Sequence, residues 1–374
     1  MALTGDADGP PLAPPTTAAL VADAELAPFG LDARVLAERA AALGLGRRGP
    51  VSCGGATRLL PGRDGWLALS LPRPSDVELL PALLGVPVQD DPWPAVARAL
   101  ASRAVAEVEA DAVTLGLAAA VVGTSARRGV EVSGQPRRRS NSTAAPRIVD
   151  LSALWAGPLC ADLLRRDGAE VVKVESTTRP DGARTGAPAF YDLLNAGKAS
   201  VALDLTTPEG RQALLAVVDT ADVVVSSSRS RAIEQLGLDP SRFLAGGSDR
   251  VWVAVTGHGW DVDRVGFGDD AAAAAGLVAW GDDGTPRFAG DAIADPLCGA
   301  LAAAAARRAW RAGGRWFVDA SLVGAAALVA PRTPVPATPA RSDGAGWVVA
   351  GHPVRDPRPR LAAGRAAPLG TVAR

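Results

Sequence analysis

The stretch RIVDLSALWAGPLCADLLRRDGAEVVKVE, which runs from Arg147 to Glu175, decides the fold. Its apolar residues follow first the spacing of a strand, then that of a helix, and then that of a strand again. The expected elements are a strand at Arg147–Leu151, a sharp turn at Ala156-Gly157-Pro158, a helix at Pro158–Arg166 that stops at Gly168, and a strand at Glu170–Glu175. Such a unit places a helix N-terminus beside strand ends, a position that favours an anionic ligand.

The same alternation continues to about residue 320. Further strands are expected at Ser200–Leu205, at Asp222–Val225 and in RVWVAVTG (250–257). Thr207-Pro208-Glu209 has the cap, first-turn proline and first-turn acid of a helix start, and short helices are expected in RAIEQLGL and DPSRFLAG. The longest helical run, Asp295–Arg311, opens with Asp-Pro. Strands separated by helices of this length predict an α/β fold with a doubly wound parallel sheet.

The rest of the chain divides by composition. GGATRLLPGRDGWLALSL predicts two short strands around a turn, and the helical spacing that follows predicts a small α+β domain ahead of the sheet. EVSGQPRRRSNSTAAP lacks periodicity and is rich in turn formers. The predicted organisation is an Ala/Pro-rich leader at 1–40 that runs loosely into a helix, the small domain at 41–130, a linker at 131–146, the large domain at 147–330 and an irregular Pro-rich tail at 331–374.

Composition excludes several classes of function. A net charge of −1 over 374 residues gives no reason to expect nucleic acid or an anionic membrane as partner. Cys53, Cys160 and Cys298 are scattered without a CxxC pair, which argues against disulfides and structural zinc and suits a reducing cytoplasm. The acidic start MALTGDADGPPLAPPTT is unlike a signal peptide, and the apolar runs are shorter than the roughly 20 residues of a membrane span. We expect a soluble cytoplasmic protein.

Common catalytic and cofactor motifs are missing from the sequence. The turn after the first strand of the large domain has only Gly157 where a dinucleotide site needs G-x-G-x-x-G, and neither a P-loop nor G-x-S-x-G occurs. His258 and His352 are the only histidines, which leaves little material for a Ser-His or Cys-His dyad and none for a His-rich metal site. No metal is expected, and acid–base work would fall to carboxylates.

Lysine is nearly absent: of 39 basic residues, only Lys173 and Lys198 are not arginine. Either an arginine-rich composition produced this by chance, or both positions require a compact ammonium rather than a guanidinium fork.

Five blocks of the large domain resemble one family. RIVDLSALWAGPLCADLLRRDGAEVVKVE, NAGKASVALDLTTPEGRQALL, ADVVVSSSRSRAIEQLGL, VWVAVTGHG and GDAIADPLCGALAAAAARRAWRAGGRWFVDASL look like the class III coenzyme A transferases, which include formyl-, carnitine- and succinyl-type CoA transferases and α-methylacyl-CoA racemases. The likeness covers about 147–322, in the family's order and near its spacing. It implies that residues 147–330 form a Rossmann-like domain that binds coenzyme A, with the turn at 156–158 facing the nucleotide.

The resemblance also implies a nucleophile. Family members have an aspartate after a glycine-containing loop, at the start of a long helix, and it attacks the acyl-CoA thioester. On GDAIADPLCG that residue is Asp295, while Asp291 lies within the loop. A helix N-terminus favours the ionised carboxylate, which can act as a nucleophile. Taken alone, the Asp-Pro pair is more typical of a helix N-cap without chemistry, and one residue can serve both roles.

Coenzyme A or acyl-CoA is implied as substrate, with no permanently bound cofactor and with a small carboxylic acid as the second partner. The implied contacts are Ala153, Leu154, Trp155, Ala156, Ser176, Leu203 and Ser227. Ser176 and Ser227 stand where the family often has a basic residue and an asparagine, and Gln235 replaces a helix arginine. Arg179 and Arg184 could supply phosphate charge or be solvated, and Trp155 could pack on adenine or fill the core.

Three functions follow from these observations. The first is a CoA transferase that uses Asp295; the others are a non-catalytic acyl-CoA-binding homologue and an α-methylacyl-CoA racemase. The racemases place a histidine about ten residues before a helix-closing glycine; counted back from Gly276, that position holds Phe267, and His258 is expected to be structural. The family's small domain normally follows the large one, whereas here it comes first, as in a rearranged or shortened member. The resemblance implies a homodimer.

Overall fold

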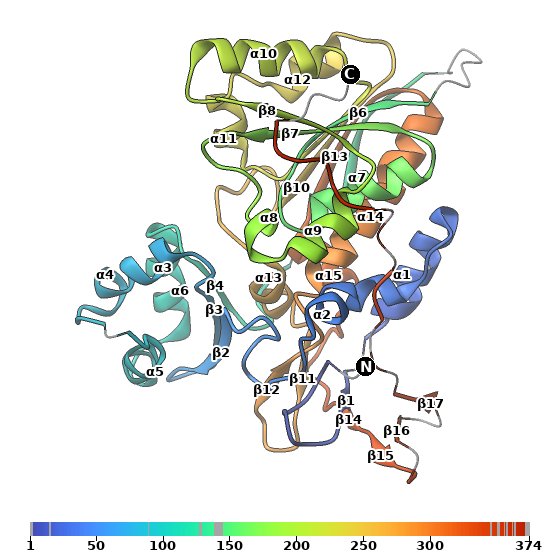
Figure 1. The fold of residues 1–374 in the computed structure, drawn as a ribbon. Helices are drawn as coiled ribbons and strands as arrows, with labels where there is room; N and C mark the ends of the chain where they lie inside the picture. The colour runs from blue at the N-terminus through green and yellow to red at the C-terminus, as the bar shows by residue number, and fades with distance from the viewer. Residues whose placement is uncertain are drawn as a thin grey trace.

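A seven-stranded sheet forms the centre of the computed structural model (Figure 1), which describes residues 3–14, 16–88, 90–126, 129–137, 145–344, 346–349, 352–354, 356, 358–360, 362 and 364–370. The spatial order is β5-β13-β10-β9-β6-β7-β8, and every neighbouring pair is parallel except β5 with β13. The strands are β5 (Glu131–Pro136), β6 (Arg147–Leu151), β7 (Glu170–Ser176), β8 (Ala199–Leu203), β9 (Val223–Ser226), β10 (Arg250–Thr256) and β13 (Gly314–Ser321).

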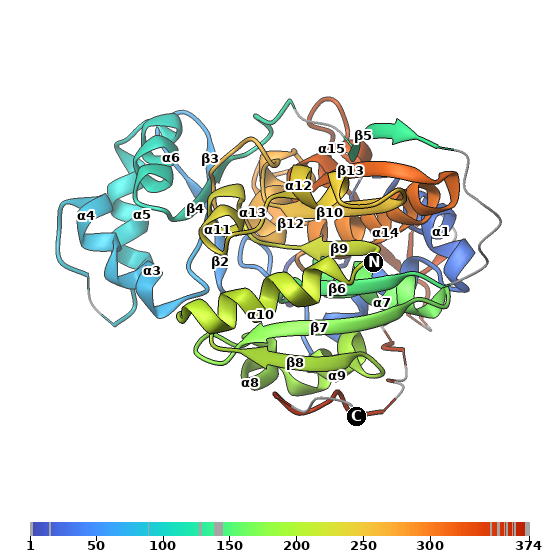
Figure 2. The same cartoon turned by 90° about the horizontal axis from the view of Figure 1, so that it is seen from above.

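The order of the parallel strands shows where the winding of the sheet reverses. From β8 to β13, as Figure 2 shows, the strands follow the chain order 3-2-1-4-5-6, so the direction of winding reverses between β6 and β9. In doubly wound sheets the crevice opens at the carboxyl ends of the two strands that flank this reversal. The predicted fold class, a Rossmann-like α/β sheet, is therefore confirmed.

Helices cover both faces of the sheet because successive strand residues point to opposite sides. Ile148 belongs to one core, shared with helices below the sheet in Figure 1, whereas Val149 belongs to a second core under the helices above it. The lower helices are α7 (Ala156–Arg166), α9 (Pro188–Asn195), α14 (Ala294–Ala312) and α15 (Leu322–Val329). The upper ones are α10 (Pro208–Asp219), α11 (Ser230–Gln235) and α12 (Pro240–Ala245).

The N-terminal residues are an integral part of the large core. They form α1 (Ala18–Leu26), the 3₁₀ turns Ala27–Phe29 and Ala33–Ala37, and α2 (Glu38–Leu43). Leu26 and Leu36 are fully buried in the same core as α14. The expectation of a loose leader at 1–40 was wrong for these residues, because apolar side chains at helical spacing bury themselves against the large domain. Arg39, on α2, is thereby brought into contact with Asp291 in the loop before α14.

A small subdomain lies beside the sheet (left in Figure 1), before it in the chain. Its antiparallel sheet consists of β2 (Thr57–Pro61), β3 (Trp66–Ser70) and β4 (Ala118–Val121), and its helices are α3 (Pro74–Glu78), α4 (Leu80–Leu84), α5 (Trp93–Ala101) and α6 (Val105–Thr114). It has its own core. It docks through Leu59 and Ala68 onto α13 (Gly268–Ala274) and onto the hairpin of β11 (Val278–Trp280) and β12 (Pro286–Phe288).

Two connecting segments differ from expectation. Residues 131–146 were predicted as a linker, but Glu131–Pro136 is β5, the edge strand that pairs with β13. A chain needs no alternating apolar pattern to form an edge strand when backbone hydrogen bonds provide the pairing. Residues 138–144 of that linker lie outside the described part. The tail predicted as irregular has the short strands β14 (Thr338–Pro339), β15 (Arg341–Ser342), β16 (Trp347–Val349) and β17 (His352–Pro353), and β14 pairs with β1 (Leu12–Ala13).

The described helices and the cysteines bear on the expectations about membranes and disulfides. Among the described residues, no helix has both the length and the apolar character needed to cross a bilayer. The three cysteines are free thiols and all are buried.

Candidate active site

The predicted coenzyme A contacts gather at the carboxyl ends of four adjacent strands. The amide of Ala153 donates to the hydroxyl of Ser227 over 2.9 Å, which ties the loop after β6 to the loop after β9 at the reversal point. Ser176 and Leu203 are register partners at the ends of β7 and β8. These residues therefore lie at the carboxyl ends of four neighbouring strands, the edge at which doubly wound sheets bind ligands. Their contact with coenzyme A remains a prediction.

The loop after β6 is strained and exposed. Leu154 has a positive φ of 70° although it is not glycine, and the residue is 46% exposed. Its amide donates to the carboxylate of Asp181. Gly157 follows, where an added Cβ would lie 2.2 Å from Cβ of Ser152. A single glycine therefore suffices for this close turn. Strained non-glycine backbone persists where the surroundings hold it, often at functional sites.

Both lysines donate hydrogen bonds to backbone carbonyls at the two ends of this loop. The ammonium of Lys198 donates to Oδ2 of Asp150, to the carbonyl of Pro158 and to Oδ1 of Asn195, each over 2.9 Å. The ammonium of Lys173 donates to the carbonyl of Ser152 over 2.8 Å. Three converging oxygen atoms match the three donors of an ammonium and not the planar fork of arginine. The need for a compact cation, rather than chance, accounts for Lys198.

Lys173 also lies 3.1 Å from Oδ2 of Asp181, and both side chains are almost fully buried. Asp181 accepts from the amides of Leu154 and Ala183, so it links the ammonium to the strained residue. These contacts form a buried polar network that fixes the conformation of the loop after β6. Such networks are stabilising only when their members are satisfied, and these are.

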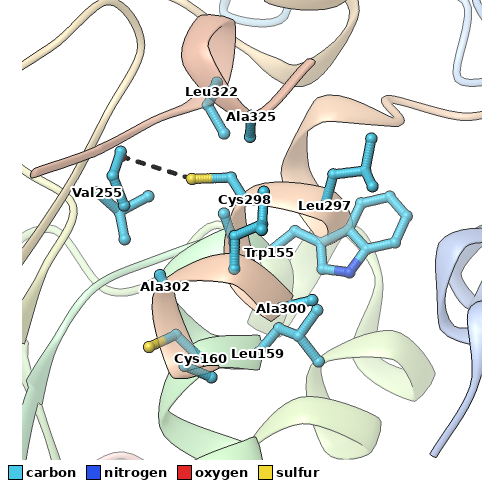
Figure 3. Close-up of a cluster of buried hydrophobic side chains, with 14 of the residues drawn as sticks. Trp155, Leu159, Cys160, Val255, Leu297, Cys298, Ala300, Ala302, Leu322 and Ala325 are labelled. Carbon is cyan, nitrogen blue, oxygen red and sulfur yellow. Dashed lines mark hydrogen bonds between the residues drawn. The ribbon is translucent and has the colours of Figure 1, made fainter. Parts of the chain in front are cut away.

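Trp155 fills the core. Its side chain is 3% exposed and packs edge-on against Phe190 with ring centroids 5.1 Å apart. Figure 3 shows it in the cluster formed by α7 and α14, beside Leu297. Of the two readings of this tryptophan, core packing is the one observed, so any contact of residue 155 with a ligand must come from its backbone.

Arg184 forms an ion pair with Glu175. Its guanidinium donates to both carboxylate oxygens of Glu175 and to the carbonyl of Ala367. The solvated alternative is therefore not the one observed, and a role of Arg184 toward a phosphate stays a prediction. Arg179, in the same loop, is exposed and keeps the two possibilities that its sequence left open.

Asp295 does not cap its helix. Helix α14 starts at Ala294 with Ile293 in the cap position, so Asp295 lies inside the first turn. Its carboxylate faces the start of α13 instead: a Cβ at Gly268 would lie 2.2 Å from Oδ2 of Asp295. By contrast, the Asp239-Pro240 pair does cap its helix, with Asp239 accepting from the amide of Ser241 over 2.8 Å. The cap interpretation of Asp295 was therefore wrong.

The position of Asp295 relates it to the crevice. One helical turn later, a Cβ at Gly299 would lie 2.7 Å from the carbonyl oxygen of Ala156, so α14 touches the start of α7 here. Both helices begin on the carboxyl side of the sheet, because each follows a loop from that side and leads back to the next parallel strand. Asp295 is half-buried, at the point where the two helix starts converge.

The charge state of Asp295 differs from expectation. Burial raises its pKa to about 7; Arg39 opposes this, while Asp270 and Asp291 add to it. The helix N-terminus was expected to keep the carboxylate ionised, but loss of hydration outweighs that effect. Burial likewise raises the pKa of Asp269 to about 7 and that of Asp270 to about 6. The acids at the starts of α13 and α14 therefore titrate close to neutral pH.

Sequence reasoning missed Arg39. Its Nε donates to Oδ2 of Asp291 over 2.9 Å, and Nη2 contacts Oδ1 of the same carboxylate. Asp291 lies in the loop before α14, as its position in GDAIAD suggested, and it is fully buried there. The aspartates in GDDA and GDAIAD were a visible signal that a cation is needed nearby. Nothing in the sequence pointed to a partner 252 residues away.

His258 is structural, as expected. It is 9% exposed, burial lowers its pKa to about 4, and Nε2 has no hydrogen-bond partner among the described residues. A Cβ at Gly266 would lie 3.1 Å from that Nε2. Phe267 is half-buried under the guanidinium of Arg73, 5.8 Å away. The position that holds a histidine in the racemases therefore has an aromatic ring here.

The fold and the site define an α/β protein whose doubly wound sheet reverses its winding between β6 and β9, with a half-buried carboxylate near the start of α7. The family described as CoA-transferase family III matches residues 145–345, more than half of the sequence, and the chain belongs to this family.

Two relatives and one solved structure illustrate the similarity. The succinate–glutarate CoA-transferase of Agrobacterium fabrum is 29% identical over 47% of this chain and 50% of its own length. The succinyl-CoA–D-citramalate CoA-transferase of Chloroflexus aurantiacus is 31% identical over 42% of each chain. A crystal structure of a CAIB/BAIF family protein from Brucella suis is 28% identical over 49% of this chain and 53% of its own, with a TM-score of 0.44. The chain thus spans about half the length of the curated relatives it matches.

Proposed function

We propose that this protein transfers coenzyme A from an acyl-CoA donor to a carboxylic acid, with Asp295 as the nucleophile. Family membership supports the reaction class. The observation that carries the residue assignment is the position of the Asp295 carboxylate, which caps no amide of its own helix, accepts from the backbone of Gly268 on α13 and lies where α14 meets the start of α7. An aspartate that caps its helix accepts a hydrogen bond from a backbone amide of that helix, as Asp239 does from Ser241.

The reaction needs a carboxylate and no external base. The ionised Asp295 attacks the thioester carbonyl and forms a mixed anhydride, while the CoA thiolate leaves with the C–S electron pair. The thiolate then attacks the aspartyl carbonyl, which gives an aspartyl-CoA thioester and releases the donor acid as its carboxylate. The acceptor carboxylate repeats the two steps in reverse and leaves as acyl-CoA. Each step exchanges one anion for another, which suits a chain with two histidines.

The crevice supplies the binding surface in this proposal. The backbone of Ala153, Leu154, Trp155 and Ala156, with Ser176, Leu203 and Ser227, would contact coenzyme A, since these residues meet at the carboxyl edge. The helix start at Ala156 offers amide groups to an anionic group. No redox step occurs, so no resident cofactor is needed. We further infer a cytoplasmic homodimer acting on a small carboxylic acid.

The test is covalent trapping. Purified protein is incubated with a panel of acyl-CoA donors, treated with hydroxylamine and digested, and the peptide with Asp295 is examined for a hydroxamate by mass spectrometry. We expect the adduct in the wild type and in the control Asp239→Asn, which changes the aspartate of a second Asp-Pro pair, at an exposed helix start. Asp295→Asn should show neither adduct nor acyl exchange.

Ligand binding separates this function from its alternative. A thermal shift with free CoA and acyl-CoAs reports binding independently of turnover, because a ligand of the folded state raises its apparent stability. Binding that persists in Asp295→Asn, together with no exchange in the wild type with any donor, would identify a non-catalytic acyl-CoA-binding homologue. Deuterium incorporation at the α-carbon would instead identify a racemase.

A further inference from the structure

The N-terminal segment contributes a charged group to the surroundings of Asp295. Arg39 lies on α2 and reaches between Trp155, whose ring is 5.4 Å from the guanidinium carbon, and Gly54, where a Cβ would be 3.3 Å from Nη2. Its side chain is 25% exposed. The neighbouring residue, Glu38, is fixed by Arg360 through a 2.5 Å contact. Arg39 therefore projects from a helix whose first residue is held by an ion pair.

We propose that Arg39 is a positioning residue for Asp295, acting through its two-point ion pair with Asp291. The proposal rests on the function proposed above, in which Asp295 is the nucleophile. Asp291 is buried four residues before Asp295, and both of its carboxylate oxygens contact the guanidinium. A planar two-point pair fixes orientation as well as distance.

The backbone between the two aspartates explains why this anchor matters. Ala292 has a positive φ of 39°, an unfavourable value for a residue with a Cβ. Its amide donates to Oδ1 of Asp269 over 2.9 Å, and its carbonyl accepts from the amide of Asp295 over 2.9 Å. The first turn of α14 therefore starts on a strained residue, which is stable only if the neighbouring contacts hold it. Arg39 holds one side and Asp269 the other.

The charges around Asp295 give Arg39 a second effect. The titratable groups that interact with Asp295 are Arg39 on α2, Asp269 and Asp270 on α13, Asp291 in the loop and Cys298 on α14. The guanidinium favours the ionised carboxylate, whereas the acids disfavour it. Removing the positive charge is therefore expected to raise the pKa of Asp295 and to reduce the ionised fraction at neutral pH.

The chain contains a closely matched control at the other end of α14. Arg307 pairs with Asp167 over 2.9 Å and lies 5.7 Å from the ring of Phe29, so it repeats the ion pair and ring contact of Arg39. Its side chain is 20% exposed. A general loss of stability from deleting such an arginine should appear equally in Arg39→Gln and Arg307→Gln, whereas an effect on Asp295 should appear only in the former.

The experiment measures Asp295 directly and then its reaction. Carbon-13 NMR of protein labelled at aspartate carboxyl groups gives titration curves, and Asp295→Asn identifies the resonance. We expect Arg39→Gln to move the midpoint upward by about one pH unit and Arg307→Gln to leave it unchanged. On the acid side of the exchange-rate profile, the Gln variant at position 39 should then be slower by up to about tenfold at a given pH.

Arg39→Lys separates charge from geometry. Lysine keeps the charge but cannot form the two-point pair, so the NMR midpoint should stay near that of the wild type while kcat falls. This variant also decides the matter if Arg39→Gln does not fold. Wild-type kcat in Arg39→Lys, or an unchanged midpoint in a folded Arg39→Gln, would overturn the proposal. The NMR titration is informative even if no donor supports exchange, which separates failure of this inference from failure of the proposed function.

Discussion

Replacing Asp295 with asparagine should stabilise the protein, and increasingly so as the pH rises. Burial raises the pKa of this carboxyl from 3.8 to about 7 in the folded chain. A group with a raised folded pKa contributes its full stability below the unfolded pKa and loses it as the pH rises through the folded one. Asparagine has nearly the shape of the carboxylic acid and carries no charge at any of these pH values.

The pKa difference sets the size of the effect. A difference of about 3 corresponds to about 4 kcal/mol once the carboxyl is fully ionised, at 1.36 kcal/mol for each tenfold change. Asp295 is only half-buried, so screening by solvent reduces this to about 2 kcal/mol. Part of the difference is already present at about pH 5, and we expect the advantage of Asp295→Asn to grow by about 1–2 kcal/mol between about pH 5 and about pH 8. Asp295 also helps to raise the pKa of Asp269, so Asp295→Asn should lower that pKa and add to the stability advantage at neutral pH.

Urea unfolding of the wild type, Asp295→Asn and Asp239→Asn at several pH values measures this growth. Asp239 is an exposed helix cap that asparagine can replace, so its variant should follow the wild type at every pH. The reasoning would be refuted if Asp295→Asn were less stable than the wild type at about pH 8, or if its advantage were the same at every pH. Either result would mean that the carboxylate is well solvated or paired in the folded chain.

Two further predictions concern the groups that hold the site. Gly268→Ala places a Cβ 2.2 Å from Oδ2 of Asp295, so acyl exchange should be lost with a stability cost of about 1–3 kcal/mol. The control Gly186→Ala, in open space on a short helix, should leave exchange rates unchanged. An active Gly268→Ala would show that Asp295 need not stay in this position. Lys198→Arg cannot satisfy three converging oxygens with a planar fork and should lower the free energy of unfolding by about 1–3 kcal/mol, measured with urea, whereas equal stability would show that the site has no preference for ammonium.

The large domain was predictable because each unit carries its own local signal. The strand at 147–151 was predicted with the bounds that the structure has, and the long helix was placed within one residue at each end. These elements have alternating or helical apolar spacing, caps and stop signals within a few residues. Ser227 and Ala153 were named from the family resemblance, and the structure joins them by a hydrogen bond between two neighbouring strand ends.

What could not be predicted depends on contacts between distant parts of the chain. Glu131–Pro136 is a strand only because β13 provides a partner 183 residues further along, since its own residues are all exposed and lack an alternating apolar pattern. The ionisation of Asp295 depends on how deeply α13 and α14 enclose it, which no local motif encodes. Arg39 resembled any other arginine in an Ala-rich leader until the fold placed it against Asp291.

Burial of Asp295 makes sense as a compromise between reactivity and charge. A carboxylate of ordinary pKa is fully ionised at neutral pH but is a weak nucleophile, because nucleophilic strength rises with basicity. A carboxyl buried among other acids without a cation would be a stronger nucleophile that is almost never ionised. With burial and two acids on one side and Arg39 on the other, its pKa is about 7, where a substantial ionised fraction coincides with raised basicity. In the proposed function, the stability lost by keeping such a group is the physical consequence of using Asp295 as a nucleophile.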